Sequence, residues 1–239
     1  MNKTYINWSS GKDAMFALHM LKNQKKYTIE KLVTTVNTDF NRVSMHGLSI
    51  NLLEQQAEAL QIPLHTIPLS GNVSIETYNT KMKNHVQLLK KEGFTHAIFG
   101  DIFLEDLKAY REKELLVVNL QPVFPLWKKN THKLITEFIQ LGYKAIVVCT
   151  SAKYLDESFC GRIIDNQFLN DLPSDVDPCG ENGEFHTFVF DGPLFYKPVR
   201  FKLGEKVLRD YTPSDEDDCF KEEKASWDYQ FWYQDLILG

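Results

Sequence analysis

The sequence lacks a long apolar run and has few cysteines, and each shortage excludes a class of protein. No uninterrupted apolar stretch approaches the roughly 18 residues that a membrane-spanning helix needs. The cysteines contain no CxxC pair, so their spacing predicts neither a zinc site nor a dithiol redox motif; they are Cys149, Cys160, Cys179 and Cys219. The amino terminus also lacks the apolar core of a secretory signal. We therefore expect reduced cysteines and a cytoplasmic protein without a membrane partner.

An excess of positive charge is missing as well. The chain has 27 Lys and Arg against 32 Asp and Glu, a formal net charge of -5, so bulk attraction to nucleic acid or anionic lipid is not expected. What is present is an ordinary globular composition, 43% hydrophobic and 25% charged, which excludes disorder for most of the chain. The 239 residues suffice for one large domain or two small ones.

The first half of the chain alternates between strand and helix patterns. Strands are expected at 3–8, 31–37, 64–69 and 95–99, a further extended segment at 117–124, and helices at 13–26, 48–60, 78–92 and 103–116. Such alternation predicts an α/β fold with a parallel, Rossmann-like sheet. Ligands on these sheets bind at the carboxyl ends of the strands. The site is therefore expected among Ser9–Asp13, Asn37–Gly47 and Gly100–Asp101.

The second half changes character after Pro122 and Pro125. A helix is expected at 131–141, strands at 145–149 and from Glu184 onward, and a half-exposed strand at Trp227–Tyr233. The acidic run Asp215–Asp218 indicates a solvated loop. We predict a domain boundary near residue 128, between a parallel α/β domain over residues 1–128 and a smaller α+β domain over 129–239.

The turn after the first strand, Ser9–Asp13, has the composition of an anion-binding loop. Backbone N–H groups near Gly11 and the following helix N-terminus favour a phosphate, and Lys12 adds a full positive charge. Asp13 can cap the helix or hold Mg²⁺. The loop matches neither the Walker pattern nor the dinucleotide glycine pattern. Taken alone, its residues fit a plain polar turn equally well.

This loop resembles the SGGKDS signature of the PP-loop ATP pyrophosphatases, whose members split ATP between the α and β phosphates. The shared positions are Ser9, Gly11, Lys12 and Asp13. Ser10 replaces the first glycine, and Ala14 replaces the last serine, which removes a hydroxyl that could contact phosphate. The resemblance implies a HUP-type nucleotide-binding fold that uses ATP and Mg²⁺.

A second segment indicates which family of PP-loop proteins the chain resembles. Residues 175–195 are similar to the GE-x-GE-[FY]-x-T segment of the diphthine–ammonia ligase family and its uncharacterised relatives. Other similar elements occur in the same order: His46-Gly47, Gly100-Asp101-Ile102 and Pro125-Leu126-Trp127. Together they extend over nearly the whole chain, from residue 3 to about residue 200.

The residues of this segment can also be interpreted by themselves. In a strand from Glu184 onward, Glu184 and His186 share one face, and Glu181 precedes them on a glycine-flanked turn. Such a group could bind an amine, accept its proton or hold a metal. Without the other motifs, a tight hairpin that happens to carry these residues is the better interpretation. With those motifs, we favour a site.

Several single residues stay open on sequence grounds. His46 could contact adenine or phosphate, or merely pack in its loop, and Asp101 could hold Mg²⁺, orient substrate or cap a helix. Cys179 has acidic neighbours, which oppose a reactive thiolate, so we interpret it as structural.

With the resemblance, nucleotide binding is expected at Ser9, Ser10, Gly11, Lys12, Asp13, His46, Gly47 and Gly100, with Asp13 as metal ligand. Catalysis is expected at Lys12, Asp101, Glu181, Glu184 and His186.

The resemblance implies a two-step ligase reaction. A carboxylate, on a small molecule or a protein side chain, attacks the α-phosphate of ATP, and ammonia or an amine then displaces AMP to give an amide. The sequence leaves two other functions open. A non-catalytic adenine-nucleotide-binding protein is suggested by Ser10 and Ala14, whereas a tRNA-modifying thiolase would need a basic face and a cysteine pair that this sequence does not offer. A homodimer is expected only as the commonest oligomer.

Overall fold

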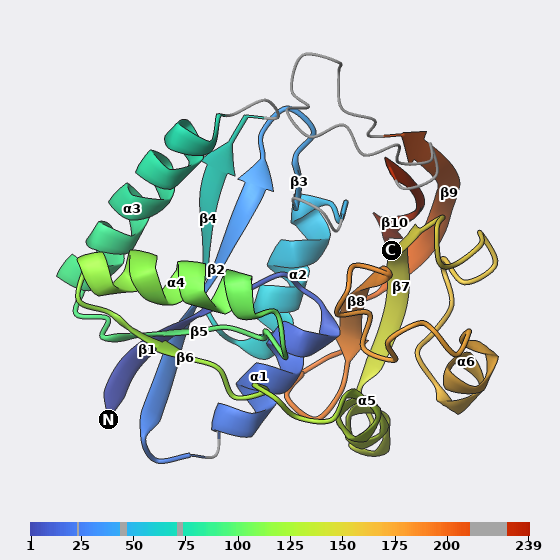
Figure 1. Ribbon diagram of the computed structural model, residues 1–239, viewed down its shortest axis with the longest axis horizontal. Coiled ribbons are helices and arrows are strands. Elements are labelled where there is room, and N and C mark those ends of the chain that lie inside the picture. Colours follow the sequence, from blue (N-terminus) through green and yellow to red (C-terminus); the bar gives the residue numbers. More distant parts are fainter. Residues whose placement is uncertain (23, 44–46, 71–73, 211–228) are drawn as a thin grey trace.

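The amino-terminal strand lies in the centre of a mostly parallel sheet (Figure 1). The computed structural model describes all residues except 23, 44–46, 71–73 and 211–228. The strands are β1 (Asn2–Asn7), β2 (Tyr27–Asn37), β3 (Arg42–Val43), β4 (Leu64–Leu69), β5 (His96–Ile98) and β6 (Gln121–Val123). Their order is β3-β2-β1-β5-β6, with β4 also paired to β2, and β3 alone is antiparallel to its neighbour. The predicted α/β fold is confirmed.

Helices cover both faces of this sheet, as right-handed crossovers require. They are α1 (Lys12–Lys22), α2 (Ile50–Leu60), α3 (Ile75–Lys91) and α4 (Glu105–Val117). Successive residues of β1 point to opposite faces: Tyr5 packs in a cluster with Leu89 of α3 and Leu115 of α4, and Ile6 packs in the core with α1 and α2. The sheet is therefore buried on both sides, and only its strand ends are available to a ligand.

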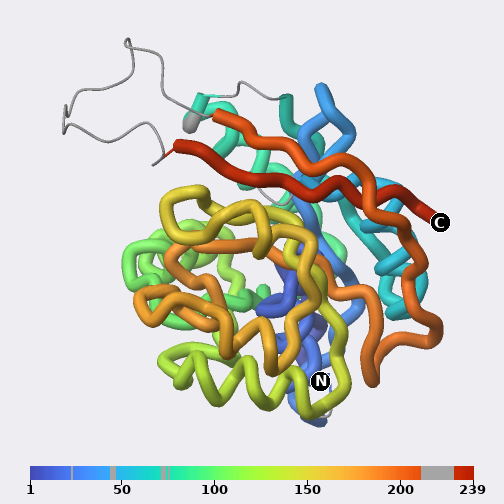
Figure 2. Tube along the Cα trace, turned by 90° about the vertical axis from the view of Figure 1, so that its right-hand side faces the viewer, coloured from blue at the N-terminus to red at the C-terminus, as the bar shows by residue number. Residues whose placement is uncertain are grey.

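A second, antiparallel sheet follows, built from β7 (Lys144–Ser151), β8 (Phe185–Asp191), β9 (Phe201–Asp210) and β10 (Gln230–Leu238). Its order is β8-β7-β10-β9, and α5 (Thr131–Gln140) and α6 (Asn166–Asp171) accompany it. Figure 2 shows β9 and β10 running side by side along one edge of the molecule. This arrangement agrees with the expected α+β character of the second half.

The two sheets share one hydrophobic core. The same buried cluster contains Ile6 and Leu18 from the first half and Phe138, Phe188 and Leu236 from the second. Strand β8 lies against the loop after β1, where the backbone N–H of Val189 donates to the carbonyl of Ser10 at 3.1 Å. The second sheet is thus fixed at the carboxyl end of β1. The boundary near residue 128 stays a prediction.

Some elements differ from expectation. The segment 117–124 is not one strand, because α4 continues to Val117, held by buried Leu115, and β6 begins only at Gln121. The strand expected from Glu184 begins at Phe185, and β9 and α6 were not expected at all. Residues 215–218 and Trp227 lie outside the described residues. No helix in the described part of the chain is long and apolar enough to cross a membrane.

Candidate active site

The loop after β1 is held in an unusual backbone conformation. Ser10 has a φ of 72°, in the left-handed region that favours glycine, and its side chain is buried. The loop also packs closely against the end of β5. A Cβ added to Gly100 would lie 2.8 Å from the backbone carbon of Asp13, so only glycine fits there without a shift. Gly100 therefore lets the end of β5 approach the start of α1.

Buried Lys12 and partly exposed Asp13 form an ion pair at the start of α1. The Lys12 side chain is 4% exposed, and its Nζ lies 2.9 Å from Asp13 Oδ2 and 5.2 Å from the ring centre of Phe185. Burial by itself would lower the pKa of Lys12, but the charge and hydrogen bond of Asp13, together with the charges of Cys179 and Glu181, outweigh burial, and the pKa is raised. Burial raises the pKa of Asp13, and the Lys12 charge partly offsets this. The site thus keeps one ammonium group beside the loop.

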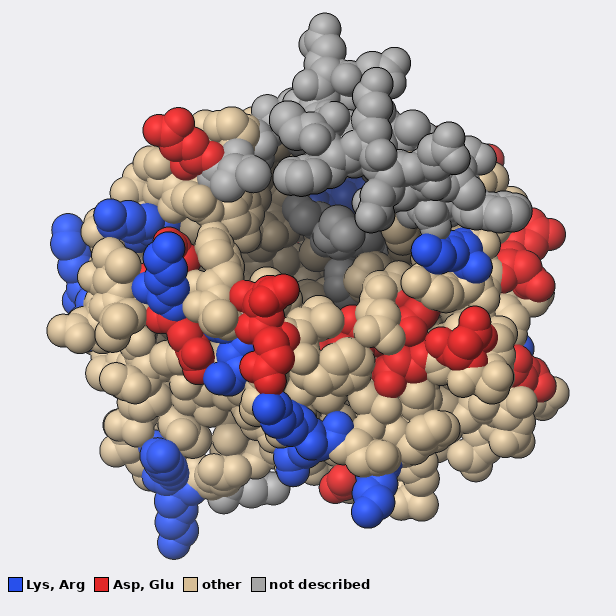
Figure 3. All heavy atoms as spheres, viewed as in Figure 1, with Lys and Arg blue, Asp and Glu red and all other residues tan. Residues whose placement is uncertain are grey.

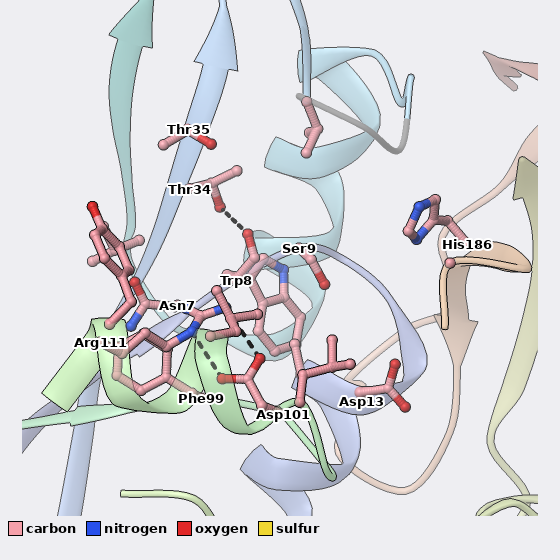
Figure 4. Close-up of a pocket in the computed structure, with 18 of the residues that line it drawn as sticks. Asn7, Trp8, Ser9, Asp13, Thr34, Thr35, Phe99, Asp101, Arg111 and His186 are labelled. Carbon is pink, nitrogen blue, oxygen red and sulfur yellow. Dashed lines mark hydrogen bonds and ion pairs between the residues drawn. The ribbon is translucent and has the colours of Figure 1, made fainter. Parts of the chain in front are cut away.

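Asp101, just after β5, forms a two-point ion pair with Arg111 of α4. Arg111 Nε lies 2.8 Å from Asp101 Oδ2, and Nη2 donates to Oδ1 at 3.1 Å (Figure 4). The guanidinium also stacks 4.4 Å from the ring centre of Phe99. Burial raises the pKa of Asp101, and the Arg111 charge opposes that rise. Sequence reasoning missed Arg111, because nothing local separates it from the other charged residues of its helix.

Glu181 reaches from the second half of the chain to the loop after β5. Its Oε1 accepts hydrogen bonds from the backbone N–H groups of Ile102 at 2.7 Å and Phe103 at 3.4 Å. Burial, with a contribution from the negative charge of Asp13, raises the pKa of Glu181 to about 7, although the two N–H groups act in the opposite direction. A carboxylate with this pKa can exchange a proton near neutral pH.

Strand β8 brings a neutral histidine to the same region. Burial, with the Lys12 charge, lowers the pKa of His186 to about 4, so its imidazole is uncharged at neutral pH. In Figure 4 His186 lies across the site from Arg111, with Ser9 and Asp13 between them. The next residue, Thr187, accepts the backbone N–H of Lys12 at 3.0 Å. Strand β8 is therefore bonded directly to the start of α1.

Glu184, unlike His186, does not line the cavity described below. Its side chain is 1% exposed, and its carboxylate accepts the backbone N–H groups of Asp177 at 3.0 Å and Asn182 at 2.9 Å. Glu184 precedes the first residue of β8, so the alternation of strand side chains does not apply to it. Instead, these bonds order the turn that presents Glu181.

One cavity of about 1710 Å³ lies at the carboxyl ends of β1 and β5. Of the expected site residues, the cavity is lined by Ser9, Lys12, Asp13, Gly100, Asp101, Glu181 and His186. Ser10, Gly11, Gly47 and Glu184 lie outside its lining; Gly47 has a φ of 64° and packs under the Tyr233 ring. His46 lies outside the described residues. Figure 3 shows the molecule hollowed on this face, with acidic side chains below the hollow.

The residues fit a magnesium ion only together with phosphate. In the described part of the chain, no group of three or more His, Cys, Asp or Glu residues could hold a metal alone. Mg²⁺ in nucleotide sites, however, is usually held by one or two carboxylates plus the phosphates, and Asp13 and Asp101 both line the cavity. Cys179 is not a candidate nucleophile, because burial raises the pKa of its thiol and Sγ donates to the Thr131 carbonyl at 3.4 Å.

The parallel sheet, the loop after its first strand and the cavity at its carboxyl edge define an α/β protein of the PP-loop type with a candidate ligand site. The chain belongs to the diphthamide synthase family: the models of the diphthamide synthase N-terminal and C-terminal domains match residues 2–117 and 130–213. Relatives named diphthine–ammonia ligase include those of Homo sapiens, 28% identical over 172 residues, and Schizosaccharomyces pombe, 31% identical over 184 residues.

These alignments cover 65% of this chain and 64% of the human relative, and 71% of this chain and 30% of the yeast relative. The chain therefore matches less than two thirds of the length of these relatives. Among solved structures, a predicted tRNA methyltransferase subunit from Methanocaldococcus jannaschii has a TM-score of 0.41 at 16% identity, covering 66% of this chain and 82% of its own. A U34-tRNA thiolase from Methanococcus maripaludis has a TM-score of 0.38 at 13% identity, covering 60% and 59%. TM-scores this low do not establish a shared fold.

Proposed function

We propose that this chain is an ATP-dependent ligase that converts a carboxylate to an amide, releasing AMP and pyrophosphate. The supporting observation is that one cavity is lined both by the loop residues Ser9, Lys12 and Asp13 and by Glu181 and His186 of the distal half. The first group suits a triphosphate, and the second suits an uncharged nitrogen nucleophile. In this proposal residues 1–128 bind ATP and residues 129–239 bind the carboxylate acceptor.

In the first step an acceptor carboxylate oxygen bonds to the α-phosphorus, and the bond to pyrophosphate breaks. Negative charge grows on the phosphoryl oxygens, and the buried Lys12 ammonium, which lines the cavity, stabilises it. Asp13 and Asp101 would hold Mg²⁺, which supplies further positive charge for the triphosphate. Arg111 keeps Asp101 in place at the mouth of β5.

In the second step the nitrogen of ammonia or an amine bonds to the acyl carbon, and AMP leaves with the electrons of the broken C–O bond. The nitrogen gives up a proton, and Glu181 is placed to accept it because its pKa is about 7. Neutral His186 adds no positive charge that would repel an ammonium ion. We assign proton transfer to Glu181 rather than Glu184, because Glu181 lines the cavity, whereas Glu184 is buried outside its lining and both its carboxylate oxygens accept backbone N–H groups.

The acceptor is proposed by class only. The human relative is named diphthine–ammonia ligase, which favours ammonia as the nucleophile here. An acceptor carboxylate on a protein side chain and one on a small molecule are both compatible with a cavity of about 1710 Å³.

The test is to incubate the purified chain with ATP, Mg²⁺, ammonium and a panel of carboxylates, and to identify the nucleotide products. We expect AMP and pyrophosphate in equal amounts, dependent on the acceptor. Release of ADP and phosphate instead would contradict the proposal. ATP that stays bound without turnover with every acceptor would favour the non-catalytic nucleotide-binding alternative.

A further inference from the structure

Gln56 is a fully buried polar residue in the middle of α2, and the proposed reaction gives it no role. Its Nε2 donates to the carbonyl of Ser10 at 3.0 Å and to the carbonyl of Val189 at 2.6 Å. Its Oε1 accepts the indole N–H of Trp8 at 2.8 Å. Both amide protons and the amide oxygen are therefore used, which offsets the cost of burying the group.

These bonds join three elements at one point. Trp8 and Ser10 belong to the segment that leads into the loop, Gln56 belongs to α2, and Val189 belongs to β8. The Ser10 carbonyl accepts from Gln56 and also from the backbone N–H of Val189 at 3.1 Å. A serine at a φ of 72° holds that conformation only when its surroundings fix it. The two bonds to the Ser10 carbonyl supply that restraint.

We propose that Gln56 is a positioning residue that fixes the loop Ser9–Asp13 for ATP and couples it to β8. The inference rests on the proposed function, because it assumes that the loop receives the triphosphate. Gln56 is absent from the lining of the cavity, so in this proposal it acts through Ser10 and Trp8. Because β8 carries His186 and Thr187, the same side chain links the phosphate loop to the acceptor side.

The test compares ATP affinity, measured by titration calorimetry, in the wild-type chain and in Gln56→Leu. We expect Gln56→Leu to weaken ATP binding about tenfold, the effect of losing one or two net hydrogen bonds. Gln55→Leu is the matched control, because this neighbouring amide donates only at the surface, to Glu58 at 3.1 Å. Leu60→Ala, at a buried position of the same helix, should lower the melting temperature without changing ATP affinity.

Gln56→Glu supplies a pH-dependent measurement of ATP affinity. This affinity, relative to wild type, would not change with pH if Gln56 only stabilised the fold. When ionised, Glu at this position faces two carbonyls and should weaken ATP binding strongly. When protonated it regains one donor and keeps the acceptor for Trp8. Its ATP affinity relative to wild type should therefore recover as the pH falls from about 8 to about 5, a range where a buried carboxyl gains its proton.

The outcomes separate this inference from the proposed function. Wild-type chain that binds ATP, with Gln56→Leu and Gln56→Glu binding equally well, would overturn the positioning role and leave the ligase proposal standing. Wild-type chain that binds no ATP would overturn both. If Gln56→Leu does not fold, the pH profile of Gln56→Glu decides: a constant ratio to wild type contradicts the inference.

Discussion

In the proposed mechanism, the first chemical step depends most on the ammonium group of Lys12. Lys12→Ala should lower kcat/KM for ATP by about 10²–10³, the usual loss when one preorganised charge or donor is removed. The variant also leaves Asp13 without its partner at 2.9 Å, so the melting temperature must be measured alongside. Lys22→Ala, at the exposed end of the same helix, is the control. Full activity in Lys12→Ala would contradict the mechanism.

The raised pKa of Glu181 predicts a pH profile. The carboxylate must be unprotonated to accept a proton, so wild-type activity should rise as the pH increases through about 7. Glu181→Gln should be much slower and should lose this inflection. The test is kcat against pH at saturating ATP, and an unchanged inflection in Glu181→Gln would assign it to another group.

The same pKa shift affects stability with a definite sign. Between pH 4.5, the ordinary pKa of a glutamate, and about 7, the folded chain holds a proton that the unfolded chain has lost. Glu181 therefore lowers the free energy of unfolding as the pH rises through this window. Urea denaturation should show a smaller loss of stability over that range in Glu181→Gln than in wild type.

Ser10 stands where the PP-loop signature has glycine, and the structure shows what this substitution costs. The residue has a φ of 72°, and its buried Oγ has no hydrogen-bond partner within the described structure. Ser10→Gly should therefore raise the free energy of unfolding by about 1 kcal/mol and should not weaken ATP binding. Ser10→Ala removes the hydroxyl but keeps the strain, so it should gain less. A lower free energy of unfolding in Ser10→Gly than in wild type would show that the serine stabilises the fold.

Among the secondary-structure elements, the end of β5 and the start of α1 pack so closely that there is no room for a side chain between their backbones. Gly100→Ala would place a Cβ 2.8 Å from the Asp13 backbone carbon, which forces the two elements apart. We expect a loss of about 1–3 kcal/mol in the free energy of unfolding and a weaker affinity for ATP. Gly239→Ala, whose Cβ would meet only ordinary contacts near 3.5 Å, is the control. Equal stability of the two variants would contradict this account.

Strongly patterned elements were predictable from the sequence. The strand at 64–69 is confirmed, and the helix expected at 131–141 ends within one residue. Strand β9 was missed because it is an edge strand rich in charged residues of both signs, and its exposed positions are often adjacent, so its sequence shows no clean alternation. The extended segment expected at 117–124 begins with two β-branched residues, Val117 and Val118, whose preference for strands does not prevent the helix from continuing to Val117.

The candidate site was predictable only where its residues belong to short motifs. Glu181 and His186 lie within one such segment, and both line the cavity with Lys12. Arg111 and Gln56 lie in the middle of helices, and their partners are distant in sequence; Gln56 bonds to Val189, 133 residues away. No local pattern encodes such contacts, because they form only when the two halves of the chain pack together.

For the whole molecule, the continuous core predicts one unfolding event. A single buried cluster runs from Ile6 in the first sheet to Phe188 and Leu236 in the second, and Arg42 pairs with Asp235 at 2.7 Å across the two halves. Calorimetry should therefore show one transition rather than two, and Phe188→Ala should lower its midpoint as a whole, at a cost of about 3–5 kcal/mol. ATP should raise that same midpoint by mass action, although its proposed site lies mainly in the first half. Two separate transitions, with ATP moving only one, would show that the halves fold independently and that the boundary near residue 128 is also a boundary of stability.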